Sequence, residues 1–238
     1  MKKAQFVIAI PIYDGVDLMD IAAPREIFSW ASNDLQELKV YFVGEADDCA
    51  PNGLKQVTTR DKLHLAPDLS FSDPRVQKPD LLWVPGGSPD ALQYEQAHLS
   101  DALMTYITEK AKTVTWLTSV CEGAILLAKL GLLNGYQATT HHAFYACMNA
   151  FPEVKMVADF PRYVKDRNRI TGGGISAGLD MAFYIVELIQ GTKTAMAAQS
   201  TMQYYPVPPI QSSIVPSACC PVKGMIPLTE DCKKKGFS

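Results

Sequence analysis

The sequence predicts an α/β fold in which a parallel sheet is covered by helices on both faces. Two patterns predict it. Short apolar, strand-like runs alternate with longer segments of helical spacing, and glycines or acidic residues follow the ends of several runs. Strand–helix alternation is typical of parallel sheets. The chain has 238 residues, 47% of them hydrophobic, which suits one sizeable α/β domain.

The expected strands are short apolar segments spread over the first three quarters of the chain. They cover residues 6–10, 38–43, 80–84, 113–120 and 169–171. Between the second and third of them, residues 44–79 form short polar and irregular pieces, in which we expect a small hairpin. The apolar run that contains the first strand follows Lys2 and Lys3 and so imitates a secretory leader. Pro11 and the lack of a small-residue cleavage site favour a buried strand instead.

The expected helices follow these strands and cover residues 24–31, 97–112, 122–130 and 177–189. Pro24 is expected in the first turn of its helix, where a missing N–H group costs nothing. Residues 1–204 are therefore expected to form a single domain. Residues 205–238 contain six prolines and form a tail that packs on the domain or on a partner subunit, or is partly disordered.

Charge and hydropathy exclude several classes of partner. The formal net charge is −3, without the strongly basic stretch that marks a nucleic-acid-binding domain. No apolar run approaches the roughly 18 residues that a membrane span needs. We therefore expect neither nucleic acid nor membrane as a partner. The six cysteines are few and unevenly spread, which predicts reduced thiols and a cytoplasmic location.

The strongest candidate for chemistry is Cys121. A β-branched strand stops at this residue, and the small residues Gly123 and Ala124 open a helix directly after it. A strand-to-helix elbow holds a nucleophile on a tight turn, and a helix N-terminus favours the reactive thiolate. The alternative is a buried cysteine that serves as a small hydrophobic residue.

Further candidates lie where other strands end. Asp14, Asp17 and Asp20 follow the first strand, and one of them could donate or accept a proton. By spacing alone, Asp14 and Asp17 are better interpreted as turn and helix-start residues. Gly86 and Gly87 could point backbone N–H groups at developing negative charge, or simply form a tight turn.

The glycine cluster at 171–178 and the histidine pair at 141–142 complete the set. The cluster, which includes Gly173, does not match a nucleotide-binding pattern and is interpreted as close backbone packing around a shared site. His141 could supply a base. With four histidines and no second ligand cluster, the sequence predicts no metal site.

Together these motifs resemble the ThiJ/PfpI superfamily. The resemblance rests on the residues at 118–123, 84–87, 138–141 and 171–180, which occur in the expected order. It covers roughly residues 5–210 and is strongest toward the isonitrile hydratase branch and the amidase-like domains of AraC-type regulators. It implies a flavodoxin-like, glutamine-amidotransferase-like fold, a homodimer, and no cofactor or metal.

Carried over by position, the resemblance implies that Cys121 is the nucleophile and that Asp20 is the acid facing it. Gly86 and Gly87 match the backbone donors of the family. Glu122 is the one clear departure, because similar hydratases carry a small hydroxyl residue there. Its carboxylate would either oppose thiolate formation beside the sulfur or point into solvent from the first turn of the helix.

Three functions are therefore open. The first is an enzyme in which the Cys121 thiolate attacks an isonitrile and water is added to give an N-substituted formamide. The second is a non-catalytic or redox-sensing ligand-binding domain. The third is hydrolysis or deglycation of another small electrophile. In each case the partner is a small electrophilic molecule.

Overall fold

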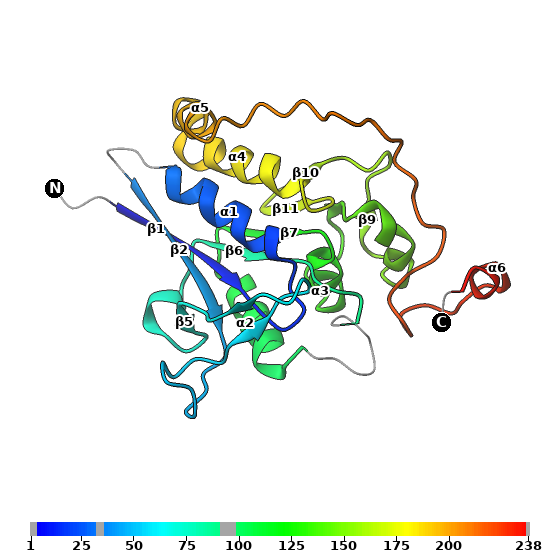
Figure 1. Cartoon of the computed structure of the whole chain (residues 1–238), viewed down its shortest axis with the longest axis horizontal. Coiled ribbons are helices and arrows are strands. Elements are labelled where there is room, and N and C mark those ends of the chain that lie inside the picture. The colour runs from blue at the N-terminus through cyan, green and yellow to red at the C-terminus, as the bar shows by residue number, and fades with distance from the viewer. Residues whose placement is uncertain (1–3, 32–35, 91–98, 237–238) are drawn as a thin grey trace.

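The computed structural model describes residues 4–31, 36–90 and 99–236, and its centre is a seven-stranded sheet. The strand order is β10-β11-β7-β6-β1-β2-β5 (Figure 1). The strands are β1 (Ala4–Pro11), β2 (Gln36–Gly44), β5 (Leu69–Ser70), β6 (Leu81–Val84), β7 (Trp116–Val120), β10 (Tyr163–Asp166) and β11 (Arg169–Gly172). Neighbouring strands are parallel except β10 and β11, which confirms the predicted fold class.

Helices cover both faces of the sheet. The helices α1 (Leu18–Trp30), α4 (Ala177–Gln190) and α5 (Thr192–Thr201) contact one another on one face (Figure 1). The helices α2 (Asp101–Ala111) and α3 (Gly123–Lys129) pack on β6 and β7. Part of the helix predicted at 97–112, Ala97 and His98, lies outside the described residues. The edge strand β10 and the helix α5 were not predicted.

The helix α1 begins earlier than predicted, which places Pro24 in its interior and Asp20 in its first turn. Proline has no N–H group to donate to the carbonyl four residues before it. That carbonyl belongs to Asp20, and the indole Nε1 of Trp83 donates to it at 2.9 Å. The prediction that Pro24 lies in the first turn is wrong, because a side chain of β6 replaces the missing helical hydrogen bond.

Smaller elements connect this framework. The strands β3 (Val57–Thr58) and β4 (His64–Leu65) form an antiparallel hairpin, as expected within 44–79. The others are the 3-10 turns η1 (Pro74–Val76) and η2 (His142–Ala150), the parallel pair β8 (Gln137–Ala138) and β9 (Lys155–Met156), and α6 (Glu230–Lys234).

The core lies around the central strands. Every residue of β6 is buried, and so is the second half of β1. Because both faces of these strands meet helices, they are continuously apolar rather than alternating. Among the described residues, no helix has both the length and the hydropathy to cross a bilayer.

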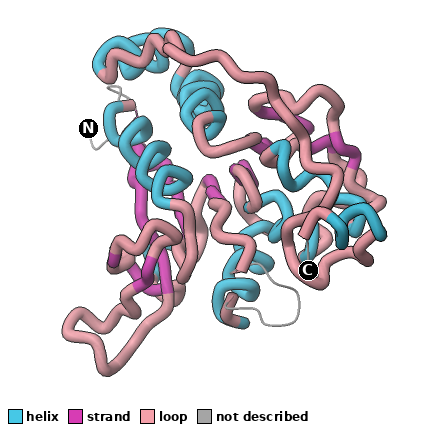
Figure 2. The backbone as a smooth tube through the Cα atoms, turned by 45° about the vertical axis from the view of Figure 1, so that its right-hand side comes forward, coloured by secondary structure: helices cyan, strands magenta, loops and turns pink. Residues whose placement is uncertain are grey.

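The C-terminal segment differs most from the expectation. After α5 the chain runs as an exposed, extended segment along one side of the molecule (Figure 2). The disulfide Cys147–Cys220 joins it to the body, and a second disulfide, Cys219–Cys232, closes a loop within the segment itself. The expectation of reduced thiols is wrong for these four cysteines, because folding brings together partners that are 73 and 13 residues apart in the sequence. Cys49 and Cys121 are free.

We expect two titratable thiols per chain in protein denatured without reductant, and six after reduction. A count with a thiol-specific chromophore measures this directly, and reduced protein serves as the control. Removing the first disulfide as Cys147→Ser with Cys220→Ser should lower the free energy of unfolding by roughly 2–4 kcal/mol, since a long loop is no longer closed. Six thiols before reduction would contradict both bonds.

Candidate active site

The site is organised around the turn that joins β7 to α3. Cys121 has a φ of 55°, in the left-handed region that side-chain-bearing residues rarely adopt. Hydrogen bonds hold this turn on both sides: the Cys121 N–H group donates to the Gly173 carbonyl at 2.8 Å, and Thr140 Oγ1 donates to the Cys121 carbonyl at 2.7 Å. The predicted nucleophile elbow is therefore present.

Glycines allow the elbow to approach its neighbours. A Cβ atom at Gly123 would collide with the Val84 carbonyl, so the start of α3 can lie directly against the end of β6. A Cβ atom at Gly86 would lie 2.8 Å from the Cys121 Cβ and would also collide with the Glu122 carboxyl group. Both positions need glycine because backbone and side chains converge there.

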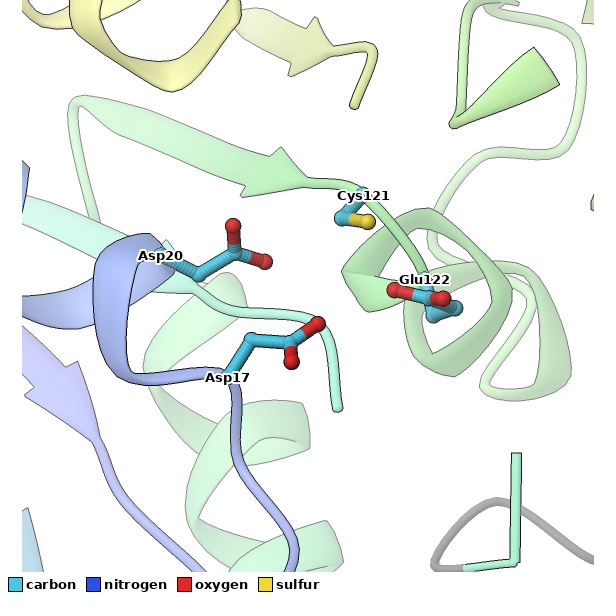
Figure 3. Close-up of side chains that lie close together, drawn as sticks. All are labelled: Asp17, Asp20, Cys121 and Glu122. Carbon is cyan, nitrogen blue, oxygen red and sulfur yellow. The ribbon is translucent and has the colours of Figure 1, made fainter. Parts of the chain in front are cut away.

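Asp20 lies beside the elbow, as the resemblance implied. It is fully buried, and its Oδ2 accepts a hydrogen bond from the Gly86 N–H group at 2.9 Å (Figure 3). Burial raises the pKa of this carboxyl group well above its usual range, and the Gly86 hydrogen bond only partly opposes that shift. Burial therefore favours the protonated form of Asp20.

Glu122 does not point into solvent. Its residue is 4% exposed, and its carboxyl group accepts a hydrogen bond from the Cys121 thiol. Burial raises its pKa to about 7. Of the two positions considered for this carboxylate, the solvent-facing one is wrong, because α3 begins against β6 and leaves its first turn no open side.

The electrostatics of the Cys121 thiol also differ from the expectation. Burial raises its pKa well above its usual value, and the negative charges of Glu122 and Asp20 raise it further. A helix N-terminus alone would lower it. Cys121 thus keeps its proton at neutral pH until a neighbouring group accepts it.

Asp17 and Arg60 belong to the site. The sequence analysis considered Asp17 but favoured a helix-start role for it, and it did not indicate Arg60. Asp17 does occupy the N-cap position of α1, but its carboxylate pairs with Arg60 instead of capping the helix. Burial raises the pKa of Asp17, while Arg60 partly offsets the shift. Asp14 lies in the turn after β1, as predicted, and its Oδ1 accepts from the Thr58 N–H group of β3 at 2.8 Å.

The other predicted residues are placed around the elbow. The N–H group of Gly86 is already bonded to Asp20, and Gly87 forms an isolated bridge with Val16. His141 stays outside the cluster: its Nδ1 accepts from the Ala143 N–H group at 3.1 Å, and burial lowers its pKa. His141 and Gly173 instead line a cavity of about 490 Å³ together with Thr140.

The elbow and α1 together form one compact group of potential ligands. Asp17, Asp20, Cys121 and Glu122 each offer one atom, and these atoms lie within 4.8 Å of one another (Figure 3). A thiolate with carboxylates could hold a cation of the zinc type. The sequence predicted no such site, because its ligands come from two distant segments.

Comparison with known proteins places this geometry in a family. A model of the DJ-1/PfpI family matches residues 7–188. The chain belongs to the DJ-1/PfpI family. This confirms the superfamily resemblance stated from the motifs.

Two curated proteins and one solved structure illustrate the relationship. The chain is 31% identical to an isonitrile hydratase of Pseudomonas putida over 84% of this chain and 79% of the hydratase. It is 30% identical to the HTH-type transcriptional regulator GbdR of Pseudomonas aeruginosa, over 63% of this chain but only 39% of the regulator. A ThiJ/PfpI family protein from Pseudomonas syringae superposes with a TM-score of 0.72 at 29% identity, covering 88% of this chain and 78% of that one. The DJ-1/PfpI family thus includes both enzymes and regulators similar to this chain.

The substitution Glu122→Gln should raise the free energy of unfolding relative to the wild type, and the difference should grow as the pH rises. The folded-state pKa of about 7 lies above the ordinary value of 4.5, so ionisation removes stability across that interval. Glutamine cannot ionise, and the difference should approach roughly 3 kcal/mol above pH 7. Urea unfolding in chelator-containing buffers across this range measures it.

The exposed Glu153 provides the matched control, because Glu153→Gln should change stability little at any pH. If the free energy of unfolding of Glu122→Gln changed with pH in the same way as that of the wild type, burial would not raise the pKa of Glu122 and the prediction would be wrong.

Proposed function

We propose that the protein is a cysteine-dependent hydratase that converts an isonitrile into an N-substituted formamide. One observation carries the proposal: the Cys121 thiol sits on a strained elbow and contacts a carboxyl group, while the buried Asp20 faces it. The similarity to an isonitrile hydratase over most of both chains supports this reaction over others.

The first half of the reaction joins the sulfur to the substrate. As Cys121 Sγ bonds to the terminal isonitrile carbon, its proton passes to the Glu122 carboxylate, with which it already shares a hydrogen bond. The carbon then holds an electron pair and takes the proton of Asp20. The product of this half is a thioimidate, R–N=CH–S–Cys121, beside an ionised Asp20 and a protonated Glu122.

The second half adds water and releases the sulfur. Glu122 returns its proton to the substrate nitrogen while water bonds to the carbon and gives a proton to Asp20. The C–S bond of the resulting adduct breaks as the hydroxyl oxygen becomes the formyl oxygen. The hydroxyl proton returns to the sulfur, so the enzyme regains its starting state and the net change is addition of one water.

The cavity beside the elbow suits the substituent on the isonitrile nitrogen. Its wall includes Thr140 and Gly173, both of which hydrogen-bond to the backbone of Cys121. Apolar side chains of Met19, Phe160 and Ile214 also line it. We propose that an apolar substituent lies there.

The alternative is a ligand-binding or redox-sensing domain without turnover. The similarity to part of a transcriptional regulator favours this role. The raised pKa of Cys121 favours it as well, because the thiol is not activated at neutral pH before a ligand binds.

We expect wild-type protein in chelator-containing buffer to form a formamide from a simple alkyl isonitrile, with Cys121→Ala as the blank. Asp20→Asn should lower turnover by roughly 100-fold or more, since a positioned proton donor contributes about that factor. Asp14 is a nearby aspartate whose Oδ1 accepts from the Thr58 N–H group, a role that the asparagine oxygen keeps, so Asp14→Asn should keep full activity. Formamide is quantified by mass spectrometry or NMR.

Glu122→Thr restores the small hydroxyl residue of the hydratase branch, and it should stay active because Asp20 can take the thiol proton once it has given its own proton to the isonitrile carbon. Activity in this variant but not in wild type would mean that the hydratase scaffold serves another task. If wild type and Glu122→Thr both match the blank, the hydratase proposal fails.

A homodimer and a cytoplasmic location remain predictions. The family resemblance implies the dimer, and a light-scattering mass of one 26.1 kDa chain at micromolar concentration would contradict it. Disulfide bonds persist in oxidising compartments, so the two bonds in the C-terminal segment count against a cytoplasmic location.

A further inference from the structure

The side chains around Cys121 include more potential ligands than a hydratase needs. Asp17 and Asp20 come from the start of α1, while Cys121 and Glu122 come from the elbow. All four are buried, and one atom from each lies within 4.8 Å of the others (Figure 3). Four acidic groups placed so close together are expensive to bury in their ionised forms without a compensating partner.

A second observation indicates that the compensating partner of these side chains is missing. Asp20 Oδ1 and Glu122 Oε2 are buried oxygen atoms without a hydrogen-bond partner among the described residues. Their residues are 0% and 4% exposed. Buried polar atoms in native proteins are almost always satisfied, so two orphans within one cluster indicate a missing ligand.

Among the described residues, no positively charged side chain hydrogen-bonds to these two oxygen atoms. Arg60 is the positive side chain that the described part of the chain brings to the cluster, and it pairs with Asp17 at the outer side. Its own side chain is largely exposed. The two orphan oxygens belong to the inner residues, which Arg60 does not contact through any hydrogen bond.

The donor set selects the type of cation. A thiolate with carboxylate oxygens suits Zn²⁺ or the chemically similar Cd²⁺, whereas Mg²⁺ and Ca²⁺ require oxygen ligands throughout. Ligand atoms around tetrahedral zinc lie roughly 3.3–3.7 Å apart, given Zn–O and Zn–S lengths of about 2.0–2.3 Å. Shifts of about an ångström would bring the four present atoms to that spacing.

We propose that Asp17, Asp20, Cys121 and Glu122 form a binding site for one divalent cation of the zinc type. Glu122 makes the site possible, because the small hydroxyl residue expected at its position would leave one carboxylate fewer. A cavity of about 510 Å³ is lined by Arg60, the residue that pairs with Asp17, and by Thr59 and Gly15.

Binding breaks the S–H bond of Cys121 and releases its proton to solvent, together with the proton of any carboxyl ligand that is protonated, with no change in oxidation state. The sulfur then donates its electron pair to the cation and cannot attack an electrophile. The cation site thus goes beyond the proposed hydratase function and competes with it for the same sulfur.

The test uses full-length protein carrying Cys49→Ser, so that Cys121 is the remaining free thiol. Titration with Cd²⁺ should produce an ultraviolet sulfur-to-metal charge-transfer band that saturates at one ion per chain. Zn²⁺ should displace Cd²⁺ and remove the band, and Mg²⁺ should not. Zn²⁺ should also raise the melting temperature.

Variants then identify the ligands. Glu122→Gln, which keeps the side-chain shape, and Asp20→Asn should each weaken Cd²⁺ binding by roughly 100-fold or more, and Cys121→Ser should abolish the band. Asp14 lies nearby but outside the cluster, so Asp14→Asn should bind Cd²⁺ with the affinity of the parent protein. Circular dichroism checks that each variant folds. If Asp20→Asn does not fold, the affinity of Glu122→Gln by itself decides the test.

Absence of a saturable band in the parent protein would overturn the proposal. Unchanged affinity in Glu122→Gln would also overturn it, because a lone thiol would then be binding the ion. These readouts do not depend on formamide production. Failure of the hydratase assay in chelator leaves the cation result intact, and the reverse also holds.

Discussion

The site depends on the left-handed backbone at Cys121. This conformation turns the chain from β7 into α3 within two residues and places the sulfur in one group with the carboxyl oxygens of Asp17, Asp20 and Glu122. A side-chain-bearing residue in this region costs about 1–3 kcal/mol and persists only where its surroundings enforce it. Here the hydrogen bonds to Gly173 and from Thr140 enforce it from two other parts of the chain.

A second constraint joins α1 to the strand β6. Trp83 donates to the Asp20 carbonyl that Pro24 leaves without a helical partner, and Gly86 donates to the Asp20 carboxyl group. One residue is thereby held through both its backbone and its side chain. This fixes Asp20 against the elbow without any charged partner, so that burial, rather than an ion pair, sets its proton affinity.

Glu122 changes the chemistry of an otherwise familiar arrangement. Its carboxyl group adds negative charge beside the sulfur and keeps the thiol protonated, yet it can also accept that proton. The same feature therefore delays thiolate formation in the resting protein and supplies a base when a substrate or a cation arrives. In the two proposals, an isonitrile and a cation compete for the same sulfur.

The sequence by itself determined the fold class, the positions of the main strands along the chain and the position of the elbow. These follow from local patterns: apolar runs, helical spacing and small residues directly after a strand. Tertiary structure decided the rest. The start of α1 depended on a Trp83 contact 63 residues away, and the pairing of Cys147 with Cys220 spans 73 residues. The inward position of Glu122 and the recruitment of Asp17 and Arg60 depended on how closely α3, β6 and the β3–β4 hairpin approach one another. Burial and long-range contacts set these features, and neither can be read from local residue patterns.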